Sequence, residues 1–527
     1  MSYRWHTNAE STRRSGSVLL LVLVLLPAAC GGQPATPASE PVTDDATAAS
    51  EPVATSRGTF RFGFNNRFLT WDLHQEQRPI ALMGYQLVYD ALLSEDLAGN
   101  PTPGLATAWS QTVDALELTL REGVVFHDGT PFNAEVAQAN LLRVREEGAP
   151  PIAQQLAAVE SIDLLDSNRI RLNLSRPVPD LLNNLARSAG MIISPEAFDT
   201  AAERPVGTGP WVFNAEESRA DVEYRFDAFP DFWDPQQQTL EQVIILILPD
   251  AAARLGALRS GEVHATAFLA AEDIATLESE GFNLVTNEAV QLGLHIFDRE
   301  GTLVPAFADE RVRLAISHAI DRETLVEVVN SGYGAPVTQR FQPGQYGYAG
   351  DIADLAYDPE QARELLTEAG VENLEFAVPI AGNPSNELQA IAGFLQEVGI
   401  TMNIETVAPG TLVQEAASGE WAAALLPINE PHVSTYVANR VQANGFLNPF
   451  NIAPDDLEAV ATEARQLPPD EAEPLWTELA RATAEQGIIV HLYTMPSLVF
   501  TTPEVRGAEV GYFQPNVLRL RGVTIEE

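Results

Sequence analysis

The sequence predicts an α/β protein with more than one lobe, and three observations carry this prediction. The chain has 527 residues, well beyond the roughly 250–300 at which one hydrophobic core stops growing. Residues 374–378, 387–398 and 400–407 have the patterns of a strand, a helix and a strand, an order typical of a sheet with parallel strands. The stretch 205–211 holds two glycines and two prolines, which excludes a regular helix or strand. We expect the chain to leave one lobe and enter another there; a loop within one large domain is the alternative.

Composition and charge exclude several classes of function. The chain has 73 acidic and 31 basic residues, a formal net charge of −42, which excludes electrostatic attraction to nucleic acid as a main activity. Every basic residue is an arginine, so a P-loop lysine, a Schiff-base lysine and a lysine general base are excluded. The single cysteine, Cys30, excludes internal disulfides and cysteine-based zinc sites. No cofactor is expected.

The N-terminal part is predicted to be an export signal followed by a tether. Arginines precede an apolar run over 18–26, and two alanines stand directly before Cys30. This arrangement resembles the bacterial lipoprotein box, although Pro27 stands where that pattern favours leucine. The resemblance implies a signal peptide over 1–29, a lipid on Cys30 and an extracytoplasmic, membrane-anchored protein. Residues 30–57, rich in small and polar residues, then form a flexible linker. A plain secreted or membrane-anchored protein, without the lipid on Cys30, is the alternative.

The folded part is expected to begin near Thr59, with elements that follow hydrophobic periodicity and capping signals. Asn133 and Asp358 are expected N-caps, and Gly370 and Gly399 are expected helix ends. Strands are predicted over 60–64, 116–120, 222–229, 243–248, 374–378 and 400–407, with another beginning at Trp421. Helices are predicted over 83–93, 134–143, 311–328, 359–369 and 387–398.

Six sequence blocks in a fixed order carry a family resemblance. They lie at 105–136, 206–211, 231–233, 258–263, 312–322 and 357–370. The second reads Val-Gly-Thr-Gly-Pro-Trp, and the first combines Leu-Ala-x-x-Trp with Asp-Gly-x-Pro-Phe. Together they resemble family 5 of the extracytoplasmic solute-binding proteins, the peptide and nickel group of ABC importer receptors. One departure is His264, where the family usually has aspartate. Read from the residues alone, these blocks have mostly structural roles.

The resemblance implies both a fold and a function. The fold is a periplasmic-binding-protein-like, two-lobed α/β fold of the large three-domain type. The implied function is a receptor without catalysis, a monomer that captures a small peptide-like solute or metal chelate between two lobes. Two or three strands would join the lobes as a hinge. The closed form would deliver the solute to an ABC permease and its ATPase subunits.

The implied domains are a discontinuous first domain (58–94, 205–300 and 495–527), an inserted second domain (95–204) and an opposing lobe (301–494).

The segment after the strand at Trp421 is where the resemblance places the ligand. In peptide-binding members an acid in this segment pairs with the peptide α-amine, and alignment puts that acid at Pro427. A proline cannot form this ion pair, which lowers the case for an ordinary peptide. The nickel-type pattern, Pro-Pro-Tyr-Asp-Pro-His, is closer to residues 427–432. His432 could therefore contact a metal or its chelator, or the residues around it could simply open the next helix.

Further candidate ligand contacts are spread along the chain. Trp71 and His74 stand in the first loop, and Phe297 stands near a crossing between lobes. Arg187 could pair with a ligand carboxylate or be a solvated helix residue, and Tyr436 could line the cavity or pack in the core. The predicted ligand-binding set is Trp71, His74, Arg187, Phe297, Pro427, Asn429, His432 and Tyr436.

Two other classes of function stay open at this point. A secreted hydrolase lacks support, because the sequence has no G-x-S-x-G elbow and no catalytic lysine or cysteine, but its many acids leave carboxylate pairs possible. The adjacent His127 and Asp128 look like a dyad but lie in a turn, so we interpret them as structural. A binding module of a sensor has the same sequence features as a transport receptor.

Overall fold

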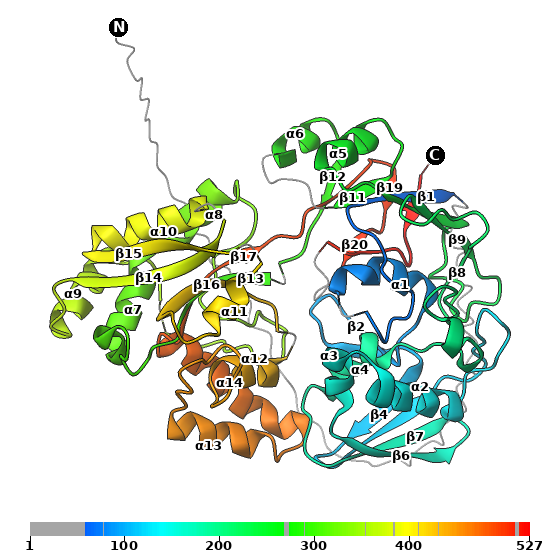
Figure 1. Cartoon of the computed structure of the whole chain (residues 1–527), viewed down its shortest axis with the longest axis horizontal. Coiled ribbons are helices and arrows are strands. Elements are labelled where there is room, and N and C mark those ends of the chain that lie inside the picture. Colours follow the sequence, from blue (N-terminus) through cyan, green and yellow to red (C-terminus); the bar gives the residue numbers. More distant parts are fainter. Residues whose placement is uncertain are drawn as a thin grey trace, which may run out of the picture. The chain divides into compact units, whose positions relative to one another are not determined.

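The structure of the protein is a computed structural model (Figure 1). It describes residues 58–76, 78–267, 273–288, 290–353, 355–382, 385–408, 410–430, 432–511 and 516–526. The predicted signal peptide, Cys30 and the linker lie outside these residues. In the part of the chain that the structure describes, no helix is long and apolar enough to cross a membrane.

A seven-stranded sheet gathers strands from distant parts of the chain in the order β12-β18-β11-β1-β10-β9-β8. The central strand β1 pairs in parallel with β10 and β11. Its residues Phe60, Phe62 and Phe64 are buried in one hydrophobic cluster with residues of helix α1 (Leu82–Val88). The strands are β1 (Thr59–Phe64), β8 (Trp211–Phe213), β9 (Glu223–Ala228), β10 (Gln242–Ile247), β11 (Ala265–Ala267), β12 (Asn283–Val285) and β18 (Val499–Thr501). Helices α5 (Ala251–Arg259) and α6 (Ile274–Ser279) and the short strands β19 (Val505–Arg506), β20 (Glu509–Val510), β21 (Leu518–Arg519) and β22 (Thr524–Ile525) complete this region.

A second hydrophobic cluster is built on an antiparallel sheet in the order β4-β5-β7-β6. Helix α2 (Ala134–Glu147) packs on this sheet and buries Ala137, Leu141 and Val144. The elements here are β2 (Leu93–Glu95), β3 (Pro101–Pro103), β4 (Ala106–Gln111), β5 (Ala115–Leu120), α3 (Pro150–Ala153), β6 (Val159–Asp166), β7 (Arg169–Leu174) and α4 (Leu181–Leu185). The loop between β7 and α4 contains Pro177 and Pro179 and enters the site described below.

Two further clusters belong to residues between β13 and β17. An antiparallel sheet, β16-β13-β17, stands beside a parallel pair, β14-β15, and Figure 1 shows α7, α9 and α10 next to that pair. The strands are β13 (Val290–Ile296), β14 (Leu374–Ala381), β15 (Ile400–Val407), β16 (Ala423–Ile428) and β17 (Ile489–Met495). The helices are α7 (Glu310–Ala319), α8 (Arg322–Val329), α9 (Pro359–Glu368), α10 (Asn386–Glu397), α11 (Leu412–Ala416), α12 (Val433–Arg440), α13 (Asp455–Ala464) and α14 (Pro469–Glu485).

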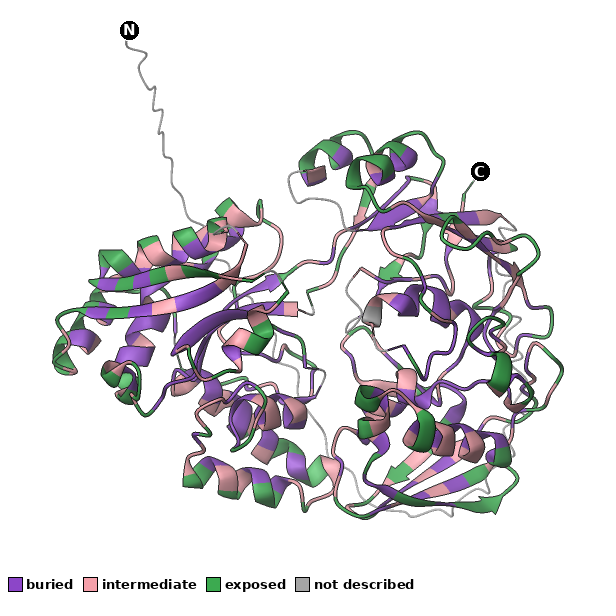
Figure 2. Ribbon diagram, in the orientation of Figure 1, coloured by how far each residue is buried: buried purple, intermediate pink, exposed green. Residues whose placement is uncertain are grey.

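Two connections join the seven-stranded sheet to the β16-β13-β17 sheet. Strand β12 leads into β13, and β17 leads into β18. The connections bond to each other: the Ser497 amide donates to the Asn287 carbonyl at 3.1 Å, and the Ser497 hydroxyl donates to the Asn287 side chain at 2.8 Å. Figure 2 shows that β13 and β17 are buried along most of their length. These two strands are therefore packed structural elements on one side of the connections.

Most of the predicted elements are confirmed, including the caps. The Asn133 side chain accepts from the Val136 amide, and Asp358 accepts from the amides of residues 360 and 361. The strand–helix–strand at 374–407 is present, and its two strands pair in parallel. These predictions succeeded because caps and periodicity are local features of the chain.

The predicted helix over 134–143 continues to Glu147. Two other predicted helices differ more in extent. The helix over 83–93 ends at Val88, and Leu93 begins a strand. The helix over 311–328 is two helices, α7 and α8, because Asp321 breaks it: its side chain accepts from the Thr324 amide and caps the second helix. Apolar residues continue across both boundaries, so periodicity alone could not reveal them.

The stretch 205–211 runs from the second cluster to the first. Val206 contacts both clusters, and Trp211 is fully buried in the first. Gly207 and Gly209 lie against the end of α1: a Cβ on Gly207 would stand 2.1 Å from the Val88 carbonyl oxygen, and the Gly209 amide donates to that oxygen at 2.8 Å. The glycines are thus required by close backbone packing.

We predict that Gly207→Ala destabilises the protein by about 1–3 kcal/mol, because the added methyl group overlaps the Val88 carbonyl. The matched control is Gly256→Ala in α5, where an added Cβ meets nothing within 4 Å. That change should stabilise the protein by about 0.5–1 kcal/mol through the helix propensity of alanine. Chemical denaturation measures both; equal effects would contradict the packing explanation.

Candidate functional site

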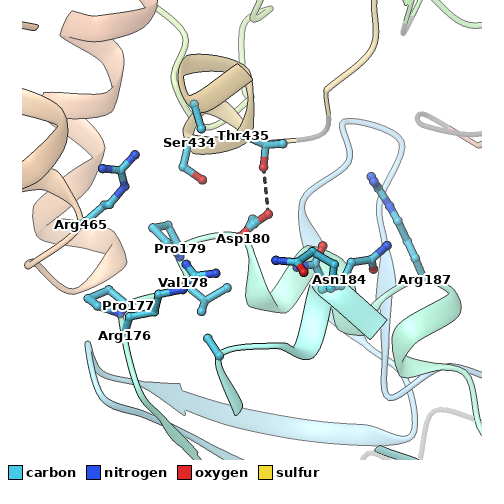
Figure 3. Close-up of a pocket in the computed structure, with 14 residues that line it drawn as sticks. Arg176, Pro177, Val178, Pro179, Asp180, Asn184, Arg187, Ser434, Thr435 and Arg465 are labelled. Atoms are coloured by element: carbon cyan, nitrogen blue, oxygen red, sulfur yellow. Dashed lines mark hydrogen bonds between the residues drawn. The ribbon is translucent and has the colours of Figure 1, made fainter. Parts of the chain in front are cut away.

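A cavity with a volume of about 610 Å³ lies between two parts of the chain. One wall comes from residues 154–187, chiefly the loop between β7 and α4, and the other from residues 434–465. Figure 3 shows that Asp180 and Thr435 meet across it, with the Thr435 hydroxyl donating to the Asp180 carboxylate at 2.8 Å. The cavity is lined by Gln154, Gln155, Ala158, Arg176, Pro177, Val178, Pro179, Asp180, Asn184, Arg187, Ser434, Thr435, Ala438 and Arg465.

A smaller cavity of about 120 Å³ also has Pro179 in its wall. Its other lining residues are Ala98, Gly99, Asn100, Pro101, Leu182, Asn183, Phe341, Gln345, Tyr346, His432 and Pro469. Two hydrogen bonds join its walls: Gln345 donates to the Ala98 carbonyl at 3.1 Å, and Asn100 donates to the Gly344 carbonyl at 3.3 Å. Two polar contacts therefore connect residues 98–100 to residues 344–345, which lie between β13 and β17.

His432, predicted as a ligand or metal contact, is the N-cap of α12. Its Nδ1 accepts from the Ser434 amide at 3.1 Å and faces the Ser434 hydroxyl at 2.8 Å, while the ring stacks on Tyr346. Burial lowers the pKa of His432 to about 4, and the nearby charge of Asp180 opposes this shift only in part. The imidazole is therefore neutral at physiological pH, and its Nδ1 is already used within the protein.

Pro427 and Asn429 stand on and just after strand β16, and both are exposed. β16 is an edge strand of its sheet, a position that tolerates a proline. The end of β16 is held against α12, because Glu430 forms a buried ion pair of 2.7 Å with Arg440. Arg440 also contacts the His295 ring at 3.1 Å. Burial, helped by the charge of Arg440, holds the pKa of His295 well below its usual value. The two exposed side chains are thus presented on a rigid base.

Arg187 lines the large cavity, as a ligand contact would. Its guanidinium is bound to the buried carboxylate of Glu95, with Nη2 2.8 Å and Nε 3.0 Å from Oε1. Burial raises the pKa of Glu95, and the charge of Arg187 opposes that rise. The positive charge of Arg187 is therefore largely compensated inside the protein.

Four other predicted contacts are buried. Trp71 stacks on Phe68 with ring centres 4.6 Å apart. The His74 Nε2 donates to the Met191 carbonyl at 3.0 Å, its Nδ1 faces Arg143 at 2.8 Å, and burial lowers its pKa to about 4. Phe297 packs in a small cluster with Leu426. The Tyr436 hydroxyl is 2.8 Å from that of Thr483, in the core.

The structure thus brings Arg187 and the start of α12 together at one place, and leaves Trp71, His74 and Phe297 elsewhere. The sequence analysis did not select Arg176, Asp180, Thr435 or Arg465. A signal for the first two was present in Arg-Pro-Val-Pro-Asp (176–180), a stiff loop with a charge at each end. No local pattern distinguishes Thr435 or Arg465.

The chain has an α/β fold with a cavity between two of its parts. Residues 100–438 match the family described as bacterial extracellular solute-binding proteins, family 5, middle region. This match covers more than half of the 527 residues, so the chain belongs to family 5 of the bacterial extracellular solute-binding proteins.

Individual relatives agree with this membership. The chain is 29% identical over 354 residues to di/tripeptide-binding protein 2 of Pseudomonas aeruginosa, a match that covers 60% of this chain and 66% of the relative. It is 26% identical over 356 residues to the dipeptide-binding protein of Escherichia coli, covering 60% and 65%. The chain therefore spans slightly less than two thirds of the length of these relatives. The solved structure of HbpA2 from Haemophilus parasuis has the same fold, with a TM-score of 0.79, 21% identity and coverage of 89% of this chain and 100% of that one.

We predict that stability near pH 5 depends on His432. A histidine in the unfolded chain has a pKa near 6.5, against about 4 in the folded protein, so the unfolded state binds more protons between these values. The contribution of this group is complete above pH 6.5 and is lost as the pH falls toward 4, by at most about 1.4 kcal/mol per pH unit.

The test compares the free energy of unfolding of the wild type and His432→Asn between pH 4 and 7. Asparagine still caps a helix, so the difference between the two proteins should be constant above pH 6.5 and should shift in favour of the variant below it. His432→Ala also loses the cap and should be less stable than His432→Asn by about 1 kcal/mol at every pH. A difference that does not change with pH would contradict the assigned pKa.

Proposed function

We propose that this chain is the solute-binding protein of an ABC importer and that it captures a small peptide-like solute between two lobes. The observation that carries the proposal is the cavity of about 610 Å³ between residues 154–187 and 434–465, found in a member of family 5. The names of the two relatives, which describe binding of dipeptides and tripeptides, support a peptide-like solute. Delivery to a permease with ATPase subunits follows from this role.

The proposed motion is hinge closure at the connections around Asn287 and Ser497. Few residues cross between the lobes there, and the clusters on each side are well packed, so bending would be confined to these connections. The solute would shift an open–closed equilibrium by contacting both lobes at once. The hydrogen bond between Asp180 and Thr435 supports contact of the two lobes at the cavity.

The proposed division into three domains keeps its predicted boundaries: 58–94, 205–300 and 495–527, then 95–204, then 301–494. Separate hydrophobic clusters support it. Among the candidate contacts, we propose direct roles for Pro427 and Asn429, which are exposed, and for Arg187 and His432, which line cavities. Trp71, His74, Phe297 and Tyr436 would act indirectly, by positioning the elements that they pack against.

A metal chelate stays an alternative cargo, but the geometry favours it less. His432 uses Nδ1 in its cap, and within the described ranges no group of three or more His, Cys, Asp or Glu side chains has the arrangement of a metal site. A hydrolase and a sensor module also stay alternatives. Assays for peptide and ester hydrolysis test the first, and the neighbouring genes, by encoding a permease or a kinase, test the second.

We predict that the purified protein carries short peptides. The protein is purified gently and denatured, and the released molecules are identified by mass spectrometry. Peptides of mixed sequence are expected, and dipeptides and tripeptides added back to the emptied protein should raise its stability. At a peptide concentration 100 times the Kd, the gain is about 2.7 kcal/mol. Release of a metal chelate instead, without any stabilisation by peptides, would contradict the proposed solute class.

We also propose that Cys30 carries a lipid anchor, so that the mature protein is tethered outside the cytoplasm. Cys30→Ala in the full chain should move the protein from the membrane fraction to the soluble fraction of bacterial cells, because the diacylglycerol attachment point is lost. The wild type treated in parallel is the control. A variant that stays in the membrane fraction would contradict the lipoprotein assignment.

A further inference from the structure

Two arginines stand on different walls of the large cavity. Arg176 follows β7 in the loop over 175–180, and Arg465 is the C-cap of α13 (Figure 3). The two residues come from the two parts of the chain that meet at the Asp180–Thr435 hydrogen bond. Any group held by both would therefore connect the inserted segment to the opposing region.

The positive charges of this cavity are not evenly compensated. Of the three arginines in its wall, Arg187 is paired with Glu95. In the described part of the chain, Arg176 makes no hydrogen bond or ion pair with another residue, and it is exposed toward solvent. Arg465 donates to the neutral side chain of Gln442, which in turn donates to Glu458. The one carboxylate in the wall, Asp180, accepts from Thr435.

Arg176 and Arg465 are close enough to repel each other. Burial lowers the pKa of Arg465, Glu458 opposes this shift, and the charge of Arg176 adds to the lowering. Guanidinium groups remain charged at any physiological pH, so the repulsion cannot be relieved by loss of a proton. An anion between the two groups would relieve it, and this is notable in a chain with a net charge of −42.

We propose that this cavity binds an oxyanion between the guanidinium groups of Arg176 and Arg465. The planar, forked guanidinium suits a carboxylate or a phosphate. The side-chain amides of Gln154 and Asn184, in the same wall, supply further donors. The inference rests on the proposed function in one respect, since it identifies the anion with the carboxylate of the captured peptide-like solute. Because the arginines belong to different walls, the bound anion also holds the lobes together.

The test is isothermal titration calorimetry on the full mature chain with three probes. They are inorganic phosphate, tri-alanine with a free carboxylate, and tri-alanine with a C-terminal amide. The variants are Arg176→Gln, Arg465→Gln and the control Arg363→Gln. Arg363 is exposed on α9 and donates to the Glu397 carbonyl, so its replacement removes the same charge away from the cavity.

If the inference is right, tri-alanine with a free carboxylate binds at least about tenfold more tightly than the amide, since charge-assisted hydrogen bonds are lost with the amide. Arg176→Gln and Arg465→Gln should each abolish this preference, and Arg363→Gln should keep it. Binding of phosphate alone, with the same dependence on the two arginines, would support the site but identify a free anion as its ligand.

The inference is overturned if neither phosphate nor tri-alanine binds in a way that depends on Arg176 and Arg465. Thermal unfolding of both variants establishes that they are folded, and the exposure of Arg176 makes its variant the safer of the two. Failure of the proposed function is a different result: the protein then carries no peptide and binds none, while arginine-dependent phosphate binding persists.

Discussion

The buried carboxylate of Asp90 is the contact on which the rest of the structure depends. It accepts from the Thr208 hydroxyl at 2.9 Å, the Trp233 indole at 2.8 Å and the Arg521 guanidinium at 2.5 Å. These donors belong to the crossing stretch, to the turn after β9 and to the C-terminal segment. A buried carboxylate is costly unless its oxygens are bonded, so the native arrangement strongly favours all three contacts together. With Gly207 and Gly209 lying against Val88, this carboxylate fixes how the first two clusters are joined.

A buried ion pair also fixes the elements near the cavity wall that contains Ser434 and Thr435. Glu430 and Arg440 hold the end of β16 against α12, and the Arg340 guanidinium donates to the Glu430 carbonyl at 2.9 Å. The side chains proposed to contact a solute belong to the loop before α4 and to the ends of β16 and α13. Bending at the connections near Asn287 would change the distance between the contact residues of the two lobes without deforming either lobe. With rigid lobes and a short hinge, a solute that binds the closed form better shifts the equilibrium from the open to the closed form.

Elements with local signals could be predicted from the sequence, but the residues that form the cavity could not. The cap at Asn133, the helix after Asp358 and the parallel pair at 374–407 were predictable because the deciding contacts span a few residues. Arg187 and His432 were selected, and both line cavities, but their contacts with Glu95 and Ser434 were not foreseen. Asp180 and Thr435 are 255 positions apart, so only the folded chain brings them together. Arg176 and Arg465 are likewise far apart in the sequence, and only the fold puts both in the wall of one cavity.

Long-range and local electrostatics oppose each other at this cavity. The net charge of −42 repels anions at a distance, but at physiological salt its effect falls off over about 8 Å. The only carboxylate among the lining residues, Asp180, accepts a hydrogen bond from Thr435, whereas Arg176 and Arg465 form no ion pair within the described residues. The local potential in the cavity therefore favours an anion. The two arginines of the wall stay charged at any physiological pH, so they keep this preference over that range. The neighbouring His432 is held neutral by burial and adds no charge. Anion selectivity would therefore arise from the position of two side chains, and it would be present only when the lobes hold them together.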